Sequence, residues 1–191
     1  FAYGLQYIRR TDALPIVPTA AGWLPDRNTL AGIEFYPGND LALFGAIRDA
    51  APDAWGRRVI EARFKVPANS LPESCYLLEA GANRAGALDI RADLNSPPTS
   101  VGVHRLDYLL EAAERIEAGL PIPQALADIF QAGSGMGGMR PKASVVDAVG
   151  QLWLAKFPSQ NERLNIPVVE EAALRLAGLA GLNVPETRIE M

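Results

Sequence analysis

Apolar residues recur at nearly every second position at the start of the chain, where Phe1, Tyr3 and Leu5 alternate with small or polar residues. Successive side chains of a strand point to opposite faces, so this pattern predicts a strand over residues 1–8. Prolines and glycines then divide residues 9–48 into short extended segments. We therefore expect this part of the chain to consist of brief extended segments joined by turns.

Helical spacing of apolar residues begins at residue 49. It predicts helices over residues 49–64, 71–80 and 106–118, and a short one that follows Pro123 and ends at Phe130. Residues 87–91 have the alternation of a strand. In the first helix, Trp55, Val59 and Ile60 approximate an apolar face, whereas the residues expected to point away are Arg57, Arg58 and Glu61.

The pattern changes at Gly133. A glycine-rich segment, 133–138, is followed by two strand-like runs, 142–146 and 151–157, which predicts a β-hairpin preceded by a glycine loop. Residues 165–181 are predicted to form a helix, and residues 184–189 a further strand. The residues expected to form the buried stripe of that helix are Val169, Ala172, Ala173, Leu176, Ala177 and Ala180.

Composition narrows the possible functions. Of the 191 residues, 49% are hydrophobic and 21% charged, which excludes an intrinsically disordered chain. A net charge of −4 gives no overall electrostatic basis for binding nucleic acid or an anionic membrane. Cys75 and His104 are the only residues of their types, so we expect no internal disulfide, no Cys/His zinc site and a cytoplasmic setting. No apolar run is long enough to predict a membrane-spanning helix.

Gly133, Gly135 and Gly138 have the spacing G-x-G-x-x-G, which by itself is most often only a tight turn. A dinucleotide-binding loop needs a helix after it, but a strand is predicted here. A phosphate-binding P-loop ends in Gly-Lys-Ser/Thr, whereas Gly138 is followed by Met139 and Arg140. Two hypotheses remain: a structural turn, or the glycine loop of a protein kinase, which lies between two strands and covers ATP phosphates.

The kinase arrangement also requires a lysine on a following strand and a glutamate on the next helix. Lys156 lies in an otherwise apolar strand, where its ammonium group either faces an anion or marks the solvent face. Glu171 and Arg175 are four residues apart, the spacing of a solvent-facing ion pair, so Glu170 is the better candidate partner for Lys156. The alternative is that Glu170 is an ordinary acid in the first turns of a helix.

These motifs in combination resemble the HipA family of bacterial toxin-antitoxin serine/threonine kinases. The stretches that carry the resemblance are 48–57, 83–88, 137–142, 153–158, 169–177 and 183–186. The resemblance implies an α+β protein with a family-specific N-terminal subdomain over residues 1–125 and the beginning of a kinase-like N-lobe over residues 126–191. The C-lobe of the kinase is expected to be absent from these residues.

The same resemblance implies an ATP-phosphate loop formed by Gly137, Gly138, Met139, Arg140, Pro141 and Lys142. Lys156 is expected to contact the α- and β-phosphates, and Glu170 to orient Lys156. Family members act in the cytoplasm, use ATP and Mg²⁺ and pair with a DNA-binding HipB-type antitoxin, and characterised members phosphorylate aminoacyl-tRNA synthetases. Gly135 stands where the family has its inhibitory autophosphorylation serine, so the neighbouring Ser134 is a possible substitute and otherwise an ordinary loop serine.

No aspartate follows Asp147, so the catalytic and metal-binding acids of phosphoryl transfer are missing from these residues. We therefore expect no catalytic residue, no metal ligand and no kinase activity in the 191-residue chain, which is interpreted as a part of a larger kinase. The alternative is a noncatalytic module that binds a HipB-type antitoxin. Three residues, Arg57, Arg58 and Arg63, form with nearby aromatic residues a cluster that is more typical of a solvated helix face than of a binding site.

Overall fold

The computed structural model describes residues 1–16, 30–38, 41–82, 84, 88–93, 95, 104–135 and 137–190. The chain separates into two compact units, Phe1–Ala50 and Ala51–Met191. Both contain helices, and the second contains the only sheet formed by the described residues, a two-stranded antiparallel hairpin. The expected α+β class is therefore confirmed. Within the described residues, no helix is long and apolar enough to cross a membrane.

The first unit is held together by aromatic residues rather than by a strand. It contains α1 (Leu5–Ile8) and α2 (Gly45–Asp49). Phe1 stacks on Phe35 with ring centroids 5.4 Å apart, and Tyr3 stacks on Tyr7 at 6.1 Å. The strand predicted over residues 1–8 is wrong from Leu5 onward, because four-residue spacing lets Tyr3 and Tyr7 stack when the chain coils between them.

The second unit begins with α3 (Ala54–Phe64), which packs against the next helix, α4 (Glu73–Glu79). The helix predicted over residues 49–64 is divided: α2 ends at Asp49 and α3 begins after Pro52, which has no N–H to continue a helical ladder. The remaining helices before the hairpin are α5 (Leu106–Glu117), the 3₁₀ turn η2 (Gln124–Leu126) and α6 (Ile129–Ala132). The predicted stop of this unit's longest helix before the hairpin is confirmed: α5 ends two residues before Gly119, which has a φ of +66°.

The predicted hairpin is confirmed. β1 (Lys142–Val146) pairs in antiparallel register with β2 (Leu152–Lys156), and Lys142 lies directly opposite Lys156. Asp147 organises the turn between them, because its Oδ1 accepts hydrogen bonds from the backbone N–H groups of Val149 and Gln151. These bonds, together with the N–H of the Trp153 indole, which is the largest cause, hold the pKa of Asp147 below its usual value.

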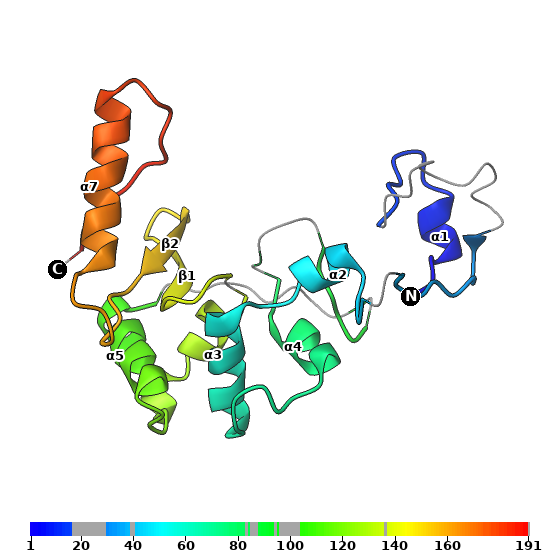
Figure 1. The fold of residues 1–191 in the computed structure, drawn as a ribbon, viewed down its shortest axis with the longest axis horizontal. Helices are drawn as coiled ribbons and strands as arrows, with labels where there is room; N and C mark the ends of the chain where they lie inside the picture. The colour runs from blue at the N-terminus through cyan, green and yellow to red at the C-terminus, as the bar shows by residue number, and fades with distance from the viewer. Residues whose placement is uncertain are drawn as a thin grey trace. The chain divides into compact units, whose positions relative to one another are not determined.

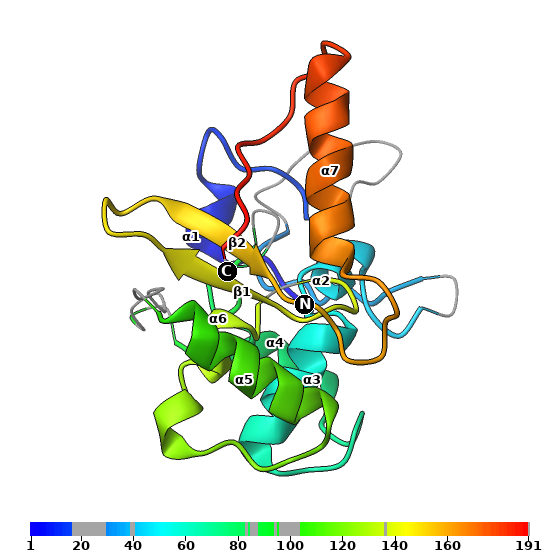
Figure 2. The same ribbon diagram turned by 90° about the vertical axis from the view of Figure 1, so that its left-hand side faces the viewer.

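The hydrophobic core of the second unit lies between the hairpin and α3, α5 and α6. Figures 1 and 2 show the hairpin on the same side of α3 and α5, and its strand β1 packs on α6. Trp55 and Val59 on α3 are fully buried and Ile60 is 1% exposed, so the predicted apolar face of this helix is confirmed. The other buried members of the core are Leu109, Ala112, Ala113, Ile116, Leu126, Ile129, Ala132, Ala143, Val145 and Phe157.

This core draws residues from both sides of the expected domain boundary between residues 125 and 126. The boundary itself stays a prediction. In packing terms, however, the helices before it and the hairpin after it share one hydrophobic core, so they stabilise each other.

The last helix, α7 (Ile166–Leu179), has little of its surface covered. Asn165 caps its N-terminus by accepting a hydrogen bond from Val168 N–H. Both views show α7 rising away from α3 and α5, with the C-terminal segment running back beside it (Figures 1 and 2). The predicted buried stripe is wrong: Val169 is 50% exposed and Leu176 66%. Periodicity identified an apolar face, but that face is largely exposed.

Two further strand predictions are corrected, and one of them lies partly outside the described residues. The segment 184–189 is not a strand but an irregular stretch in which the Arg188 guanidinium lies 4.5 Å from the centroid of the Trp153 ring. Of the strand predicted over residues 87–91, residue 87 lies outside the described residues and residues 88–91 do not form a strand.

Glu61 on α3 was expected to point into solvent, but its side chain is buried. The residue is 5% exposed, and its Oε1 accepts hydrogen bonds from the Tyr76 hydroxyl and the Asn69 backbone N–H, each at 2.6 Å. Burial, and secondly the bond to Glu61, raise the pKa of Tyr76. The expectation failed because two donors from outside the helix turn towards this carboxylate, which no helical periodicity reveals.

Replacing Glu61 is expected to destabilise the second unit. Glu61→Ala removes the acceptor of two hydrogen-bond donors and should lower the free energy of unfolding by about 2–3 kcal/mol. Glu61→Gln keeps an acceptor oxygen and should cost less. Urea denaturation would measure both, with Glu111→Ala on the exposed face of α5 as the control, where an exposed ion pair contributes at most about 0.5 kcal/mol. Equal losses in all three variants would contradict this role.

Candidate functional site

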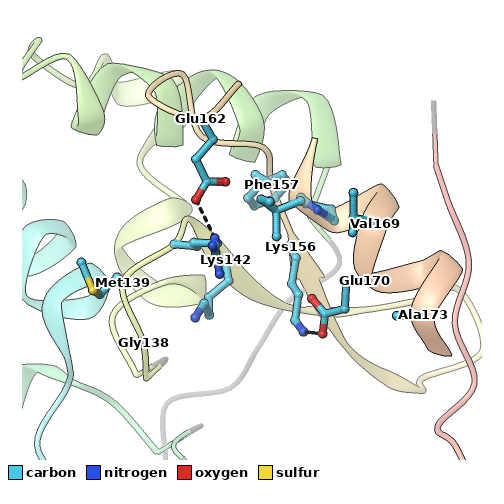
Figure 3. Close-up of a pocket in the computed structure, with 12 residues that line it drawn as sticks. Gly138, Met139, Lys142, Lys156, Phe157, Glu162, Val169, Glu170 and Ala173 are labelled. Atoms are coloured by element: carbon cyan, nitrogen blue, oxygen red, sulfur yellow. Dashed lines mark hydrogen bonds and ion pairs between the residues drawn. The ribbon is translucent and has the colours of Figure 1, made fainter. Parts of the chain in front are cut away.

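Lys156 and Glu170 form an ion pair between the end of β2 and the second turn of α7. Figure 3 shows the two side chains pointing toward one another from these elements. Lys156 is the last residue of β2, and the Asn165 cap begins α7 so that Glu170 faces the hairpin. The predicted contact between the Lys156 ammonium group and the Glu170 carboxylate is therefore present. Both side chains are about 40% exposed, so solvent can reach the pair.

A cavity of about 690 Å³ lies beside this ion pair. It combines three cationic groups, two carboxylates and an apolar wall (Figure 3). The lining residues are Gly138, Met139, Arg140, Lys142, Lys156, Phe157, Glu162, Ile166, Pro167, Val169, Glu170 and Ala173. A concave surface with a few charged groups beside apolar side chains is typical of a small-molecule site.

Lys142 is the second lysine of the cavity, and its Nζ donates a hydrogen bond to the Gly137 carbonyl at 2.6 Å. Burial, and secondly the ammonium group of Lys156, lower the pKa of Lys142, while the Asp53 and Glu170 carboxylates act in the opposite direction. The effect of Lys156 follows from the hairpin register, which places the two lysines directly opposite each other. An anion bound between them would relieve this repulsion.

The glycine loop is fixed by the N-terminus of α3. Gly138 N–H donates to Asp53 Oδ2 at 2.7 Å, and Gly138 O accepts from Trp55 N–H at 3.0 Å. The Trp55 indole N–H also donates to the carbonyl of Lys142, the first residue of β1, at 2.8 Å. An acid just before a helix is ordinarily explained by the helix dipole alone. The contact of Asp53 with Gly138, 85 positions away, has no local signal in the sequence.

Arg140 extends from the glycine loop to Glu162, with 2.7 Å between Nε and Oε1. The second carboxylate oxygen, Oε2 of Glu162, is buried and has no hydrogen-bond partner among the described residues. No sequence motif singles out Glu162. In the cavity, Arg140 is therefore already paired, whereas Glu162 has a partner for only one of its two carboxylate oxygens.

Most of the expected ATP-binding residues lie together. Among those lining the cavity are Gly138, Met139, Arg140, Lys142, Lys156 and Glu170. Gly137 and Pro141 belong to the same loop without lining it, and Pro141 is buried. Their roles in binding ATP stay predictions. Ser134, the possible autophosphorylation site, is 2% exposed, so modification would require its segment to move.

The arginine cluster on α3 serves the packing of α3 and α4. Arg57 pairs with Glu73 at 2.5 Å and lies 4.3 Å from the centroid of the Tyr76 ring, and Arg63 pairs with Glu79 at 2.7 Å. Trp55, an aromatic residue near these arginines in the sequence, is fully buried. Elsewhere, the two residues singled out by their rarity also have ordinary surroundings: His104 Nδ1 lies 3.0 Å from Asp128 Oδ2, and Cys75 is a free thiol.

Comparison with known families confirms part of the resemblance. Residues 134–191 match the family model described as the HipA-like C-terminal domain. The match includes the glycine loop, the hairpin and α7, and therefore the whole lining of the cavity. No curated protein and no solved structure matches the chain.

The proximity of the two lysines can be tested by titration. Lys156→Met removes a positive charge opposite Lys142 and frees the Glu170 carboxylate, and both changes favour the charged ammonium. We expect the pKa of Lys142 to rise, as measured by NMR of the lysine side chains. Lys65→Met, at the end of α3 and outside the cavity lining, is the control and should leave the pKa of Lys142 unchanged. A fall in that pKa in Lys156→Met would contradict the geometry.

Proposed function

We propose that the chain is the N-terminal part of a HipA-like protein kinase and that the cavity beside Lys156 receives the phosphates of ATP. The ion pair between Lys156 and Glu170, next to a glycine loop, is the observation that carries this proposal. A lysine held by a helix carboxylate keeps its ammonium group in place before a phosphate arrives, which is how kinases use this pair. The family match over residues 134–191 supports the same function.

The charges of the cavity suit a polyphosphate. Arg140, Lys142 and Lys156 supply three positive charges, whereas Glu162 and Glu170 supply two negative ones. Both carboxylates already accept hydrogen bonds from cations, so they mainly orient Arg140 and Lys156. The apolar residues on α7, including Val169 and Ala173, provide a wall against which a nucleoside could pack.

For Mg²⁺, which the resemblance implies, the described residues offer no adequate ligand set. No group of three or more metal-ligating side chains occurs among the described residues. The two carboxylates of the cavity are paired with Arg140 and Lys156. We therefore assign no step to a metal within this chain. In the intact kinase we propose that other residues hold Mg²⁺ and that phosphate passes from ATP to a serine or threonine of a protein substrate in the cytoplasm.

A second candidate is a noncatalytic module that binds a HipB-type antitoxin. One observation favours it: two of the polar groups at the loop are satisfied internally, since Gly138 N–H is bound to Asp53 and the Lys142 ammonium to the Gly137 carbonyl. A loop that serves only as a turn would have such contacts. In the first candidate, the antitoxin and a substrate such as an aminoacyl-tRNA synthetase are proposed partners of the whole protein.

The two candidates differ in their prediction for nucleotide binding. Isothermal titration calorimetry of the 191-residue chain is expected to show binding of ATP that depends on Lys156. Lys156→Met should weaken it about tenfold, the order of magnitude lost with one hydrogen bond to a charged group. Glu170→Gln should weaken it less, because the ammonium group remains but is no longer held by a charge.

Lys65→Met removes the same charge from the end of α3 and serves as the matched control, with unchanged affinity expected. ATP binding that is equally strong in wild type, Lys156→Met and Lys65→Met would place the nucleotide elsewhere. Absence of ATP binding in the wild-type chain would favour the antitoxin-binding module.

Phosphate transfer itself is expected to be absent from this chain. No aspartate follows Asp147, and phosphoryl transfer in kinases requires aspartates to orient the hydroxyl and to hold the metal. Incubation of the 191-residue chain with radiolabelled ATP, Mg²⁺ and a generic protein substrate should give no labelled product above a blank without enzyme. Robust labelling that is lost in Lys156→Met would show that the catalytic groups lie within these residues after all.

A further inference from the structure

The glycine loop and the N-terminus of α3 satisfy each other's backbone groups. Asp53 is the N-cap residue of α3, yet its carboxylate makes no hydrogen bond to its own helix. It accepts instead from Gly138 N–H, while Gly138 O accepts from Trp55 N–H. A capping residue normally accepts from the first turn of its own helix. Here Gly138 of the loop supplies the acceptor for the first turn of α3, and Asp53 accepts from the loop in return. The conformation of the loop therefore depends on the position of α3.

The two adjacent glycines of the loop are required by this contact. A Cβ atom on Gly137 would lie 3.1 Å from Asp53 Oδ2, closer than an ordinary van der Waals contact. A Cβ atom on Gly138 would lie 2.5 Å from the Nζ of Lys142, and Gly138 has a φ of +89°, which L side chains rarely adopt. The Gly-Gly pair therefore allows a carboxylate on one side and an ammonium group on the other to approach the backbone.

The support on which the loop rests is packed into the core. Trp55, two residues after Asp53, is fully buried, and its indole N–H donates to the Lys142 carbonyl at the start of β1. α3 is thereby fixed to the hairpin by packing and by a hydrogen bond. Asp53 holds the loop in a defined place relative to the strand that begins with Lys142 and its partner strand that ends with Lys156.

Fixing Gly138 determines which backbone donors remain for a ligand. The N–H groups of Met139 and Arg140, both in the cavity lining, donate to no acceptor among the described residues. Consecutive backbone N–H groups in a loop form binding sites for phosphate oxygens. The bond from Gly138 to Asp53 removes one donor from this set and holds the next two at the cavity.

We propose that Asp53 is a positioning residue for phosphate binding, which acts through Gly138 to hold the N–H groups of Met139 and Arg140 at the cavity. The inference rests on the proposed function of the same cavity. It assigns the placement of the glycine loop to a residue of α3, outside the segment that matches the HipA-like family model. Asp53 itself does not line the cavity.

The test compares ligands that differ in their phosphates. Asp53→Ala should weaken the binding of ATP and of inorganic tripolyphosphate to the 191-residue chain by about three- to tenfold, as expected for loss of one positioning hydrogen bond. Binding of adenosine should not change. Asp53→Asn still offers an oxygen to Gly138 N–H and should restore most of the lost affinity. Asp107→Asn, which removes an exposed carboxylate on α5 outside the cavity lining, is the charge-matched control.

Electrostatics alone predicts the opposite sign. Removing a negative charge near Lys142 and Lys156 would tighten the binding of anions, so tighter or unchanged tripolyphosphate binding in Asp53→Ala would overturn the positioning role. A loss of equal size for adenosine would also overturn it, because a general loss of structure does not select phosphates.

A second readout does not depend on a bound ligand. Hydrogen exchange followed by NMR should show that the Gly138 amide is protected in the wild type and exchanges faster in Asp53→Ala, while the Trp55 indole stays protected. Unchanged exchange at Gly138 would overturn the inference. If neither ATP nor tripolyphosphate binds the wild-type chain, the proposed function fails and this role fails with it. If both bind in a Lys156-dependent manner and Asp53→Ala binds them equally well, only the role of Asp53 is wrong.

Discussion

The antiparallel register of the hairpin places two lysines opposite each other, and the rest of the site is arranged around that constraint. Directly opposed residues of an antiparallel pair project to the same side, so Lys142 and Lys156 repel each other across the strands. Each ammonium group turns to an acceptor of its own: Lys142 to the Gly137 carbonyl and Lys156 to Glu170. The glycine loop and α7 are thus held beside the hairpin by the same pair of charges, and the cavity lies where those charges meet.

The position of the glycine loop is set by a helix that precedes it by some eighty residues. Asp53 and Trp55 bind Gly138 from the start of α3, and the burial of Trp55 fixes that helix in the shared core. A glycine-rich loop by itself samples many conformations, because glycine has no Cβ to restrict its backbone, and ordering it costs entropy. The contacts with α3 reduce that freedom before any ligand binds. The helices before the hairpin therefore take part in forming the site and do not merely accompany it.

The sequence predicted correctly those features that follow from residues close together along the chain. The hairpin follows from two short apolar runs around a turn, and the pairing of Lys156 with Glu170 follows from the order of loop, strand and helix. What it missed depends on contacts between distant segments. Glu61 is buried because the Tyr76 hydroxyl and the Asn69 N–H turn towards it, and Asp53 binds Gly138 across 85 positions. Helical periodicity places a side chain on a face but does not reveal which partner meets it.

The placement of Glu170 arises from the start of α7 and not from packing along its length. The apolar face of α7 is largely exposed, so the helix cannot be oriented by burial of that face. The segment before it is instead attached to α5, because Glu117 accepts hydrogen bonds from the Ser159 hydroxyl at 2.6 Å and from Gln160 N–H at 3.1 Å. The Asn165 cap then fixes where the first turn begins. The ion pair with Lys156 adds a second contact one turn beyond the cap, so the first turns of α7 are fixed to the hairpin at two points.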